Sequence, residues 1–104
     1  MNQADLLRQI LSPLIEDYKY WFERSHRLLS QQVLSFLTPE DQQALLERVE
    51  AAQAELGAAD MLYQLSEQQV GIDPALMAKW HHLLMECAEL GRRFYASQSS
   101  SEQG

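Results

Sequence analysis

The sequence predicts an all-α protein: an antiparallel up-down-up bundle of three long helices, followed by a disordered C-terminal tail. Apolar residues recur at steps of three and four along most of the chain, which is helical spacing. Two Pro-containing segments divide this pattern into three parts. Only 4 Gly and 3 Pro among 104 residues leave little material for the turns of an all-β fold. The length suits one domain, which we place at residues 1–96, with the tail at 97–104.

The first helix is predicted from an apolar stripe in the first third of the chain. Its members alternate steps of four and three residues: Leu7, Leu11, Leu14, Tyr18, Trp21, Ser25 and Leu28. Pro13 lies inside the stripe, where it removes one backbone donor and crowds the carbonyl four residues earlier. Because the stripe keeps its phase across Pro13, we expect one kinked helix and not two separate helices.

The second helix is predicted to begin at Pro39. Thr38 can cap the free N–H groups of its first turn, and proline suits the first helical position. The helix carries two apolar stripes: Leu45, Val49, Ala52, Leu56, Ala59 and Tyr63 in one, and Ala44, Ala51, Ala58, Leu62 and Leu65 in the other. A helix that is apolar on two flanks is expected to have two neighbours.

The third helix is predicted to run from Pro74 to about Tyr95. Gly71 suits a left-handed stop for the preceding helix, and Asp73 can cap the new one. Residues 97–104 are rich in Ser and Gln without periodicity, so we expect them to be disordered. At 1.5 Å per residue, helices of about 30 residues reach about 45 Å, which predicts a thin rod with much surface for its core. Such a rod gains stability from a partner.

The charge of the chain is negative and uneven. Fifteen acidic residues against eight basic ones give a net charge of −7, which disfavours nucleic acid and anionic membranes as partners. Residues 40–67 contain a single basic residue, Arg48, beside seven acidic ones: Glu40, Asp41, Glu47, Glu50, Glu55, Asp60 and Glu67. This segment is either a solvated face that keeps the protein soluble or a surface for a basic partner.

The sequence contains no arrangement of residues typical of catalysis. Cys87 is the single cysteine. Its place on the apolar stripe of the third helix predicts a small core side chain and not a nucleophile. That stripe consists of Met77, Trp80, Leu84, Cys87, Gly91 and Phe94. His82, Glu86 and Glu89 share one helix face, but an ion there would lie in solvent. Neither a Gly-rich phosphate loop nor a nucleophile elbow is present. We therefore expect no enzyme, no cofactor and no metal.

The sequence also predicts a cytoplasmic protein without direct membrane insertion. No apolar run approaches the roughly 20 residues that span a bilayer. The N-terminus lacks a basic segment followed by an apolar stretch, so we expect no export. A single cysteine excludes an internal disulfide and suits a reducing compartment.

The best candidate for a functional surface is a protein-binding one. Tyr20 points away from the first apolar stripe and is flanked by charged residues, a composition found at protein interfaces. We predict that the acidic face around Glu47, Glu50 and Glu55, with Tyr20 as an anchor, binds a basic protein partner.

Two other functions remain open at this point. The bundle could open between Trp21, Tyr63 and Trp80 to carry a flat pigment or a lipid. Alternatively, the chain could be a purely structural homodimer. The self-contact would then use the stripe of small residues Ala44, Ala51 and Ala58.

Several short segments, in their order along the chain, resemble a family of small cyanobacterial proteins that carry a domain of unknown function. These segments are PLIEDYKYWFERS (13–25), SFLTPED (35–41), VGIDP (70–74), WHH (80–82) and EC (86–87). The resemblance covers about residues 5 to 95 and implies a cytoplasmic, all-helical protein of an oxygenic photosynthetic bacterium. It further implies an accessory role in photosystem assembly, peripheral to thylakoid membranes through a partner. It assigns no active-site residue.

Overall fold

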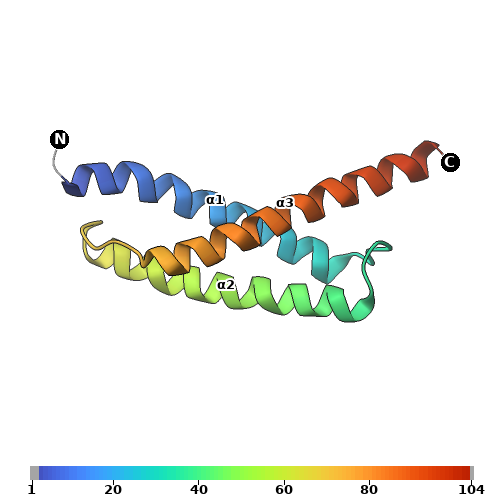
Figure 1. Ribbon diagram of the computed structural model, residues 1–104, viewed down its shortest axis with the longest axis horizontal. Helices are drawn as coiled ribbons and strands as arrows, with labels where there is room; N and C mark the ends of the chain where they lie inside the picture. The colour runs from blue at the N-terminus through green and yellow to red at the C-terminus, as the bar shows by residue number, and fades with distance from the viewer. Residues whose placement is uncertain (1–2, 104) are drawn as a thin grey trace.

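Three antiparallel helices make up the computed structural model, which describes residues 3–103 (Figure 1). They are α1 (Gln3–Gln31), α2 (Pro39–Leu65) and α3 (Pro74–Gln103). Within the described range no strand is present. The molecule measures 56 × 25 × 19 Å, so the predicted thin three-helix rod is confirmed.

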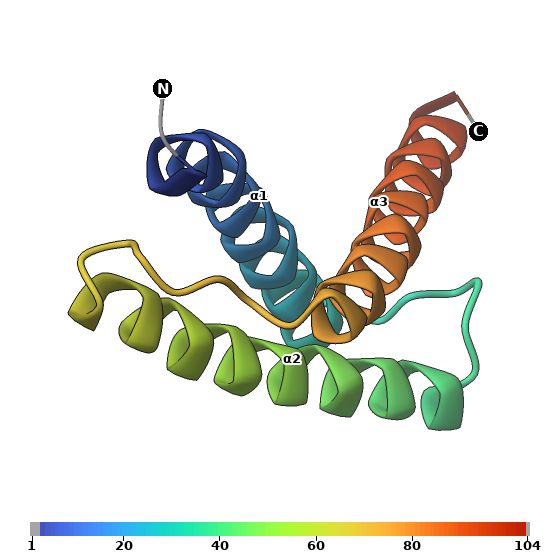
Figure 2. The same ribbon diagram turned by 60° about the vertical axis from the view of Figure 1, so that its left-hand side comes forward.

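The helix α1 is the central element of the bundle, because it packs against both α2 and α3. Figure 1 and Figure 2 show that α1 and α3 cross each other above α2 and diverge on either side of the crossing. Side chains at the rims join α2 to α3: Arg48 binds Glu86, and Lys79 Nζ lies 3.2 Å from both oxygens of Glu55. The helix α3 therefore packs mainly on α1, and these rim side chains are what join it to α2.

Pro13 does not divide the first helix. It lies inside the single helix α1, as the unbroken phase of the apolar stripe predicted. The buried side chains of α1 follow one face: Leu11, Ile15, Tyr18, Phe22, Ser25 and Leu29. The stripe therefore keeps its phase across Pro13 in the folded protein as well.

The start of α2 follows the predicted capping pattern. Thr38 is the N-cap, and its Oγ1 accepts a hydrogen bond of 3.0 Å from the backbone N–H of Asp41. Pro39 occupies the first turn, where no intrahelical donor is needed. The carboxylates of Glu40 and Asp41 in this turn complement the positive end of the helix dipole.

The end of α2 differs from the expectation. The left-handed residues are Glu67 (φ 59°) and Gln68 (φ 64°), and Gly71 has no positive φ. The N–H of Gln68 donates to the carbonyl of Tyr63 (2.8 Å), and that of Glu67 donates to Gln64 (3.0 Å). These two bonds form a Schellman motif that ends α2 at Leu65. The predicted stop at Gly71 is therefore wrong, because this pair of bonds ends the helix at Leu65, six residues before that glycine.

The helix α3 begins as predicted and extends further than predicted. Asp73 Oδ1 accepts a hydrogen bond of 2.9 Å from the N–H of Ala75 at its start. At its other end, residues 97–103 are helical, whereas the sequence predicted a disordered tail at 97–104; Gly104 lies outside the described residues. No Gly or Pro occurs at 92–103, and a formed helix propagates easily through such a segment. Ser97 and Gln98 do not belong to the hydrophobic core.

An aromatic group at the crossing of α1 and α3 forms the centre of the core. The ring of Tyr18 stacks on Phe22 at 6.0 Å and meets the edge of Trp80 at 5.8 Å. Phe22 and Trp80 are completely buried. Burial also raises the pKa of Tyr18, whose hydroxyl donates to the carbonyl of Met77 at 3.5 Å. This packing fixes the crossing point from which α1 and α3 diverge.

Candidate protein-binding site

The helix α2 is apolar on two opposite faces, and only one of them is covered. Its inward face buries Val49, Ala52, Leu56 and Tyr63. Its opposite face, which we call the outer α2 face, consists of nine exposed residues: Glu40, Ala44, Glu47, Ala51, Ala54, Ala58, Met61, Leu62 and Leu65. They lie within about 60° of one line along the helix, at about 100° per residue. The second apolar stripe of α2 thus has no neighbour within the described chain.

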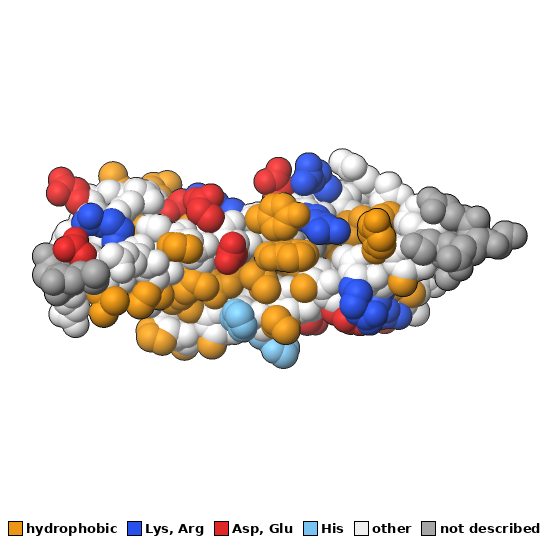
Figure 3. Space-filling view, turned by 90° about the horizontal axis from the view of Figure 1, so that it is seen from above, with side chains coloured by type: hydrophobic (Ala, Val, Ile, Leu, Met, Phe, Trp, Pro, Cys, Tyr) orange, Lys and Arg blue, Asp and Glu red, His pale blue; other side chains and the backbone are white. Residues whose placement is uncertain are grey.

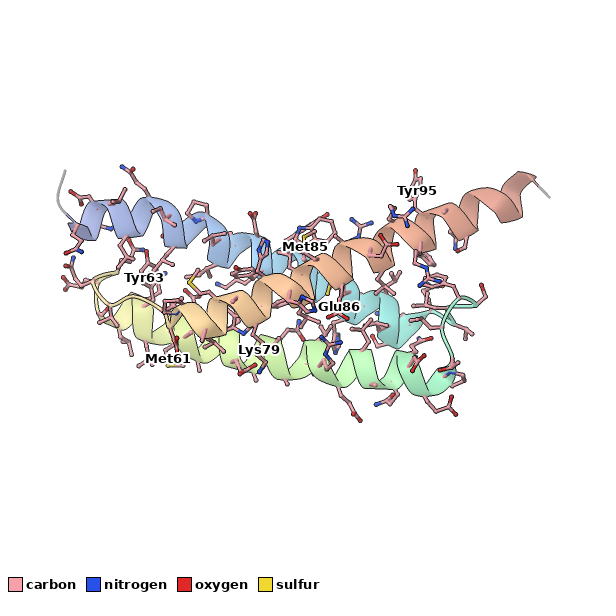
Figure 4. All side chains as sticks on the ribbon, in the orientation of Figure 1. Met61, Tyr63, Lys79, Met85, Glu86 and Tyr95 are labelled. Carbon is pink, nitrogen blue, oxygen red and sulfur yellow. The ribbon has the colours of Figure 1, made fainter. Side chains whose placement is uncertain are left out.

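The exposed apolar side chains gather at the C-terminal end of this face. Met61, Leu62 and Leu65 are 62%, 64% and 74% exposed. Figure 4 shows Met61 on the side of α2 away from α1. An uncovered group of large apolar side chains next to exposed alanines is typical of a contact surface for another protein.

The three glutamates predicted to bind a partner have different surroundings. Glu47 is exposed, and its described contact is a hydrogen bond of 3.4 Å from Gln43 Nε2. Glu50 lies 3.3 Å from His26 Nε2 of α1, and Glu55 accepts from Lys79 of α3. Only Glu47 therefore lies on the outer α2 face, whereas Glu50 and Glu55 take part in contacts between helices.

Tyr20 does not join these glutamates. It is 55% exposed on α1, and its ring packs edge-to-face on Trp21 at 5.3 Å. The flank of α1 that faces α2 is marked by Lys19, which binds Asp60 of α2 at 2.6 Å. Tyr20 lies about 100° further round the helix, away from α2. The structure thus divides the predicted site into two surfaces, one on α2 and one on α1.

Ion pairs at the helix rims leave the outer α2 face without a cation. The hydrogen bond between Lys19 and Asp60 raises the pKa of the amine and lowers the pKa of the carboxyl group. Arg48 binds Glu86 of α3 and lowers the pKa of that carboxyl group (Figure 4). Because Arg48 is the single basic residue of the segment 40–67, no basic side chain of α2 remains to neutralise Glu40 and Glu47.

The three aromatic residues suggested for a ligand cavity do not line a common one. Tyr63 and Trp80 are buried in the core, and the hydroxyl groups of Tyr63 and Ser12 share a hydrogen bond of 3.0 Å. Trp21 lines a surface depression between α1 and α3 that includes neither of them. An opening between these three side chains would require the core to separate.

The polar residues of α3 form no metal centre. Among the described side chains, no group of three His, Cys, Asp or Glu residues could hold an ion. Glu86 binds Arg48, and His82 Nε2 lies 3.9 Å from Glu86 Oε2. Cys87 is buried as predicted, and burial raises the pKa of its thiol. Over the described range, no helix has both the length and the apolar character needed to cross a membrane.

Ala54 and Met61 belong to neither of the two stripes predicted for this helix. Both residues project close to the line of Glu47 at about 100° per residue, so the sequence contains the signal. The predicted stripe takes steps of seven from Ala44 to Ala51 and Ala58, whereas steps of three and four from Ala44 also reach Ala54 and Met61.

No match was found among curated proteins or among solved structures. The model of one protein family matches residues 1–96, which is nearly the whole chain. Its description is "Protein of unknown function (DUF2605)". The family resemblance noted in the sequence segments is therefore confirmed, and the chain belongs to the DUF2605 family.

Proposed function

We propose that this protein is a non-enzymatic protein–protein interaction module that binds a basic partner helix through the outer α2 face. One observation carries the proposal: α2 has a second apolar face that no part of the described chain covers, and the carboxylates on it have no cationic partner. A helix with one uncovered apolar face is a common docking element for an amphipathic helix.

The shape of the face suits a helix. Ala51, Ala54 and Ala58 follow one another at helical spacing, and their small side chains allow a second helix to approach closely. Beyond them, the flexible side chain of Met61 and the branched Leu65 provide adaptable apolar contacts. Apolar side chains at positions i, i+3, i+4 and i+7 of the partner would pack along this line.

The charges of the face favour one orientation. Its carboxylates, Glu40 and Glu47, lie in the N-terminal half of α2, whereas Met61 and Leu65 lie at the C-terminal end. A partner helix with Lys or Arg at one end and large apolar side chains at the other would match this gradient. It would place its basic end over Glu40 and Glu47.

A homodimer through the same face is the second candidate. The exposure of Ala44, Ala51 and Ala58 supports it, since nothing in the described chain covers these residues. Charge opposes it, because each copy has a net charge of −7 and would bring carboxylates to the interface without a cation. Sedimentation equilibrium at several concentrations separates the two candidates: a concentration-independent monomer mass excludes the homodimer.

The family resemblance supports a more specific form of the proposal. In it, the module is a cytoplasmic accessory factor in the assembly of photosynthetic complexes, and it lies at thylakoid membranes through its partner. The outer α2 face does not depend on this extension. Fractionation of the native host into membrane and soluble parts tests it directly.

An affinity purification from native-host lysate tests the proposal. The bait is the full chain, and a double variant, Glu40→Lys with Glu47→Lys, changes two exposed residues that bridge no other helix in the described structure. We expect a protein with a basic helical segment to be retained by the wild type at low salt and lost at high salt and with this variant.

A matched control makes the same change in charge on another surface of the protein. Asp17→Lys with Glu23→Lys changes two exposed acidic residues of α1 by the same total charge. The control should retain the partner. Equal loss with both double variants would show that net charge, and not the outer α2 face, governs the binding, and the proposal would fail.

A further inference from the structure

A second surface of the molecule is a depression between α1 and α3, near their crossing. We call it the α1/α3 groove; Trp21 and Arg24 of α1 line it, together with Gly91, Arg92 and Tyr95 of α3 and two alanines. The depression has a volume of about 520 Å³. Figure 3 shows this side of the molecule, with hydrophobic side chains gathered across its middle and both basic and acidic side chains beside them.

Arg24 is held in place in this groove without a counter-ion. Its guanidinium lies over the ring of Trp21, 5.4 Å from the ring centre. Its guanidinium also lies against α3 at Gly91, where a Cβ atom would be in ordinary van der Waals contact with Arg24 Nη2 at 3.6 Å. Among the described residues no carboxylate pairs with Arg24, although the chain has fifteen acidic residues. The groove thus presents a positioned cation to solvent.

Aromatic side chains surround this cation. Tyr95 lines the groove at 72% exposure, and Figure 4 shows it on the side of α3 away from α2. Tyr20 packs on the edge of Trp21 and extends the aromatic surface along α1. Arg92 adds a second guanidinium, which binds Glu89 on the same helix. Trp, Tyr and Arg are the residue types that contribute most binding energy at protein interfaces.

We propose that the α1/α3 groove binds an acidic peptide segment of a partner protein. A carboxylate of the segment binds the guanidinium of Arg24, and a neighbouring apolar side chain packs between Trp21 and Tyr95. The occupant is anionic because the free charge in the groove is positive. This surface contains no residue of α2, so it is separate from the outer α2 face and selects a partner of the opposite charge.

A peptide is favoured over an anionic membrane surface. The net charge of −7 repels a bilayer of anionic lipids as a whole, whereas a short segment meets only the local charge of the groove. The groove is a shallow depression between two helices, and a short segment can lie along it.

Tryptophan fluorescence gives a local measurement of binding. In a Trp80→Phe background, Trp21 is the single tryptophan, and it lines the groove. The probe is a library of 12-residue peptides that combine two Glu residues with Leu and Phe at varied spacings, beside the same peptides with Gln in place of Glu. We expect a saturable change in Trp21 emission with acidic members, and at least tenfold weaker binding of their Gln versions.

Arg24→Gln should weaken the binding of the acidic peptide at least tenfold, and high salt should weaken this binding as well. Arg27→Gln is the matched control, because it removes the same charge from an exposed position of α1 outside the groove, and it should change affinity less than twofold. If circular dichroism shows that the Arg24→Gln variant is unfolded, Arg24→Lys replaces it, because lysine keeps the charge and lacks the paired donors of arginine. The affinity for the acidic peptide should then fall by less than tenfold but more than twofold.

Three results would overturn the proposal. The first is the absence of saturable binding by any acidic member, and the second is equal affinity of the Gln versions. The third is binding that depends on Arg24 with phosphatidylglycerol vesicles but not with peptides, which would assign the groove to a lipid surface. Each result leaves the outer α2 face untouched, so failure here is distinct from failure of the proposed function.

Discussion

Gln42 on α2 donates a hydrogen bond of 2.8 Å from its side-chain amide to the carbonyl of Leu29 near the C-terminus of α1. The same amide donates to the carbonyl of Gln32 (2.8 Å), and Gln42 Oε1 accepts from the N–H of Leu34 (3.3 Å). The carbonyl of Leu29 belongs to the last turn of α1, where it has no partner within the helix. One side chain of α2 therefore caps the preceding helix and fixes the connection between them.

Replacing this side chain should destabilise the bundle. Gln42→Ala leaves the partly buried carbonyl of Leu29 without a donor, which costs about 1–3 kcal/mol in the free energy of unfolding. The measurement is urea denaturation followed by circular dichroism. Gln43→Ala, at the exposed neighbouring position, is the control and should cost less than about 0.5 kcal/mol. Equal losses for both variants would disprove the capping role of Gln42.

The end of α2 allows a stabilising change. Glu67 has a φ of 59°, a conformation that costs an ordinary residue about 1 kcal/mol and a glycine almost nothing. Glu67→Gly should therefore raise the free energy of unfolding by about 0.5–1 kcal/mol. Glu67→Ala removes the same charge and keeps the unfavourable φ, so it separates the two effects. A gain of equal size with alanine would show that charge, and not backbone conformation, is responsible.

The loss of stability on replacing the buried Trp80 should depend strongly on the residue that replaces it. Trp80 is completely buried, and its Nε1–H has no hydrogen-bond partner. Trp80→Ala should cost about 3–5 kcal/mol, since it leaves a large cavity against Tyr18. Trp80→Phe keeps an aromatic ring in this space and removes the unpaired donor. It should therefore lower the free energy of unfolding by less than about half of the loss with alanine. Chemical denaturation of both variants measures this ratio, and similar losses would mean that the indole nitrogen is satisfied in solution.

The ion pairs at the helix rims should make stability depend on acid pH. Lys19 lowers the pKa of Asp60, and Arg48 lowers the pKa of Glu86. A lowered pKa in the folded state contributes stability that is present above the ordinary carboxyl pKa of about 4 and is lost as pH falls through the folded-state pKa. Because these pairs are partly exposed, each is worth about 1 kcal/mol or less.

The double variant Asp60→Asn with Glu86→Gln tests this assignment. Its free energy of unfolding should be lower than that of the wild type at pH 7, and it should fall less between about pH 5 and pH 2. Urea denaturation across this range gives the slope. If the variant lost as much stability on acidification as the wild type, other carboxylates would be responsible for the acid sensitivity.

The parts of the fold that depend on local sequence were predictable. Thr38 and Asp73 cap helices by contacts within three residues, so the starts of α2 and α3 could be placed from the sequence. The helical period likewise placed Trp80 and Cys87 in the core. The end of α2 could not be placed in the same way, because the bonds that close it run to the carbonyls of Tyr63 and Gln64, and the side chain of Tyr63 is held in the core.

The surfaces depend on how the helices are arranged, and the sequence does not contain that arrangement directly. The second stripe of α2 indicated a second neighbour, but only the structure shows that no element of the described chain covers it. Similarly, Tyr20 was recognised as exposed, whereas its place beside the α1/α3 groove depends on the angle between α1 and α3. The two neighbours of Arg24 in the groove, Trp21 of α1 and Gly91 of α3, likewise come together only in the folded chain, since Gly91 is 67 residues from Arg24 in sequence.

The most direct test of the central claim is site-specific photocrosslinking in the native host. Benzoylphenylalanine replaces Ala54 at the centre of the outer α2 face, and in a control protein it replaces Ala75, which is exposed at the start of α3. The account predicts a crosslinked adduct from position 54 with a protein that carries a basic helix, no such adduct from position 75, and loss of the adduct when Glu40 and Glu47 are changed to Lys. The absence of an adduct at position 54, or the same adduct at both positions, would contradict it.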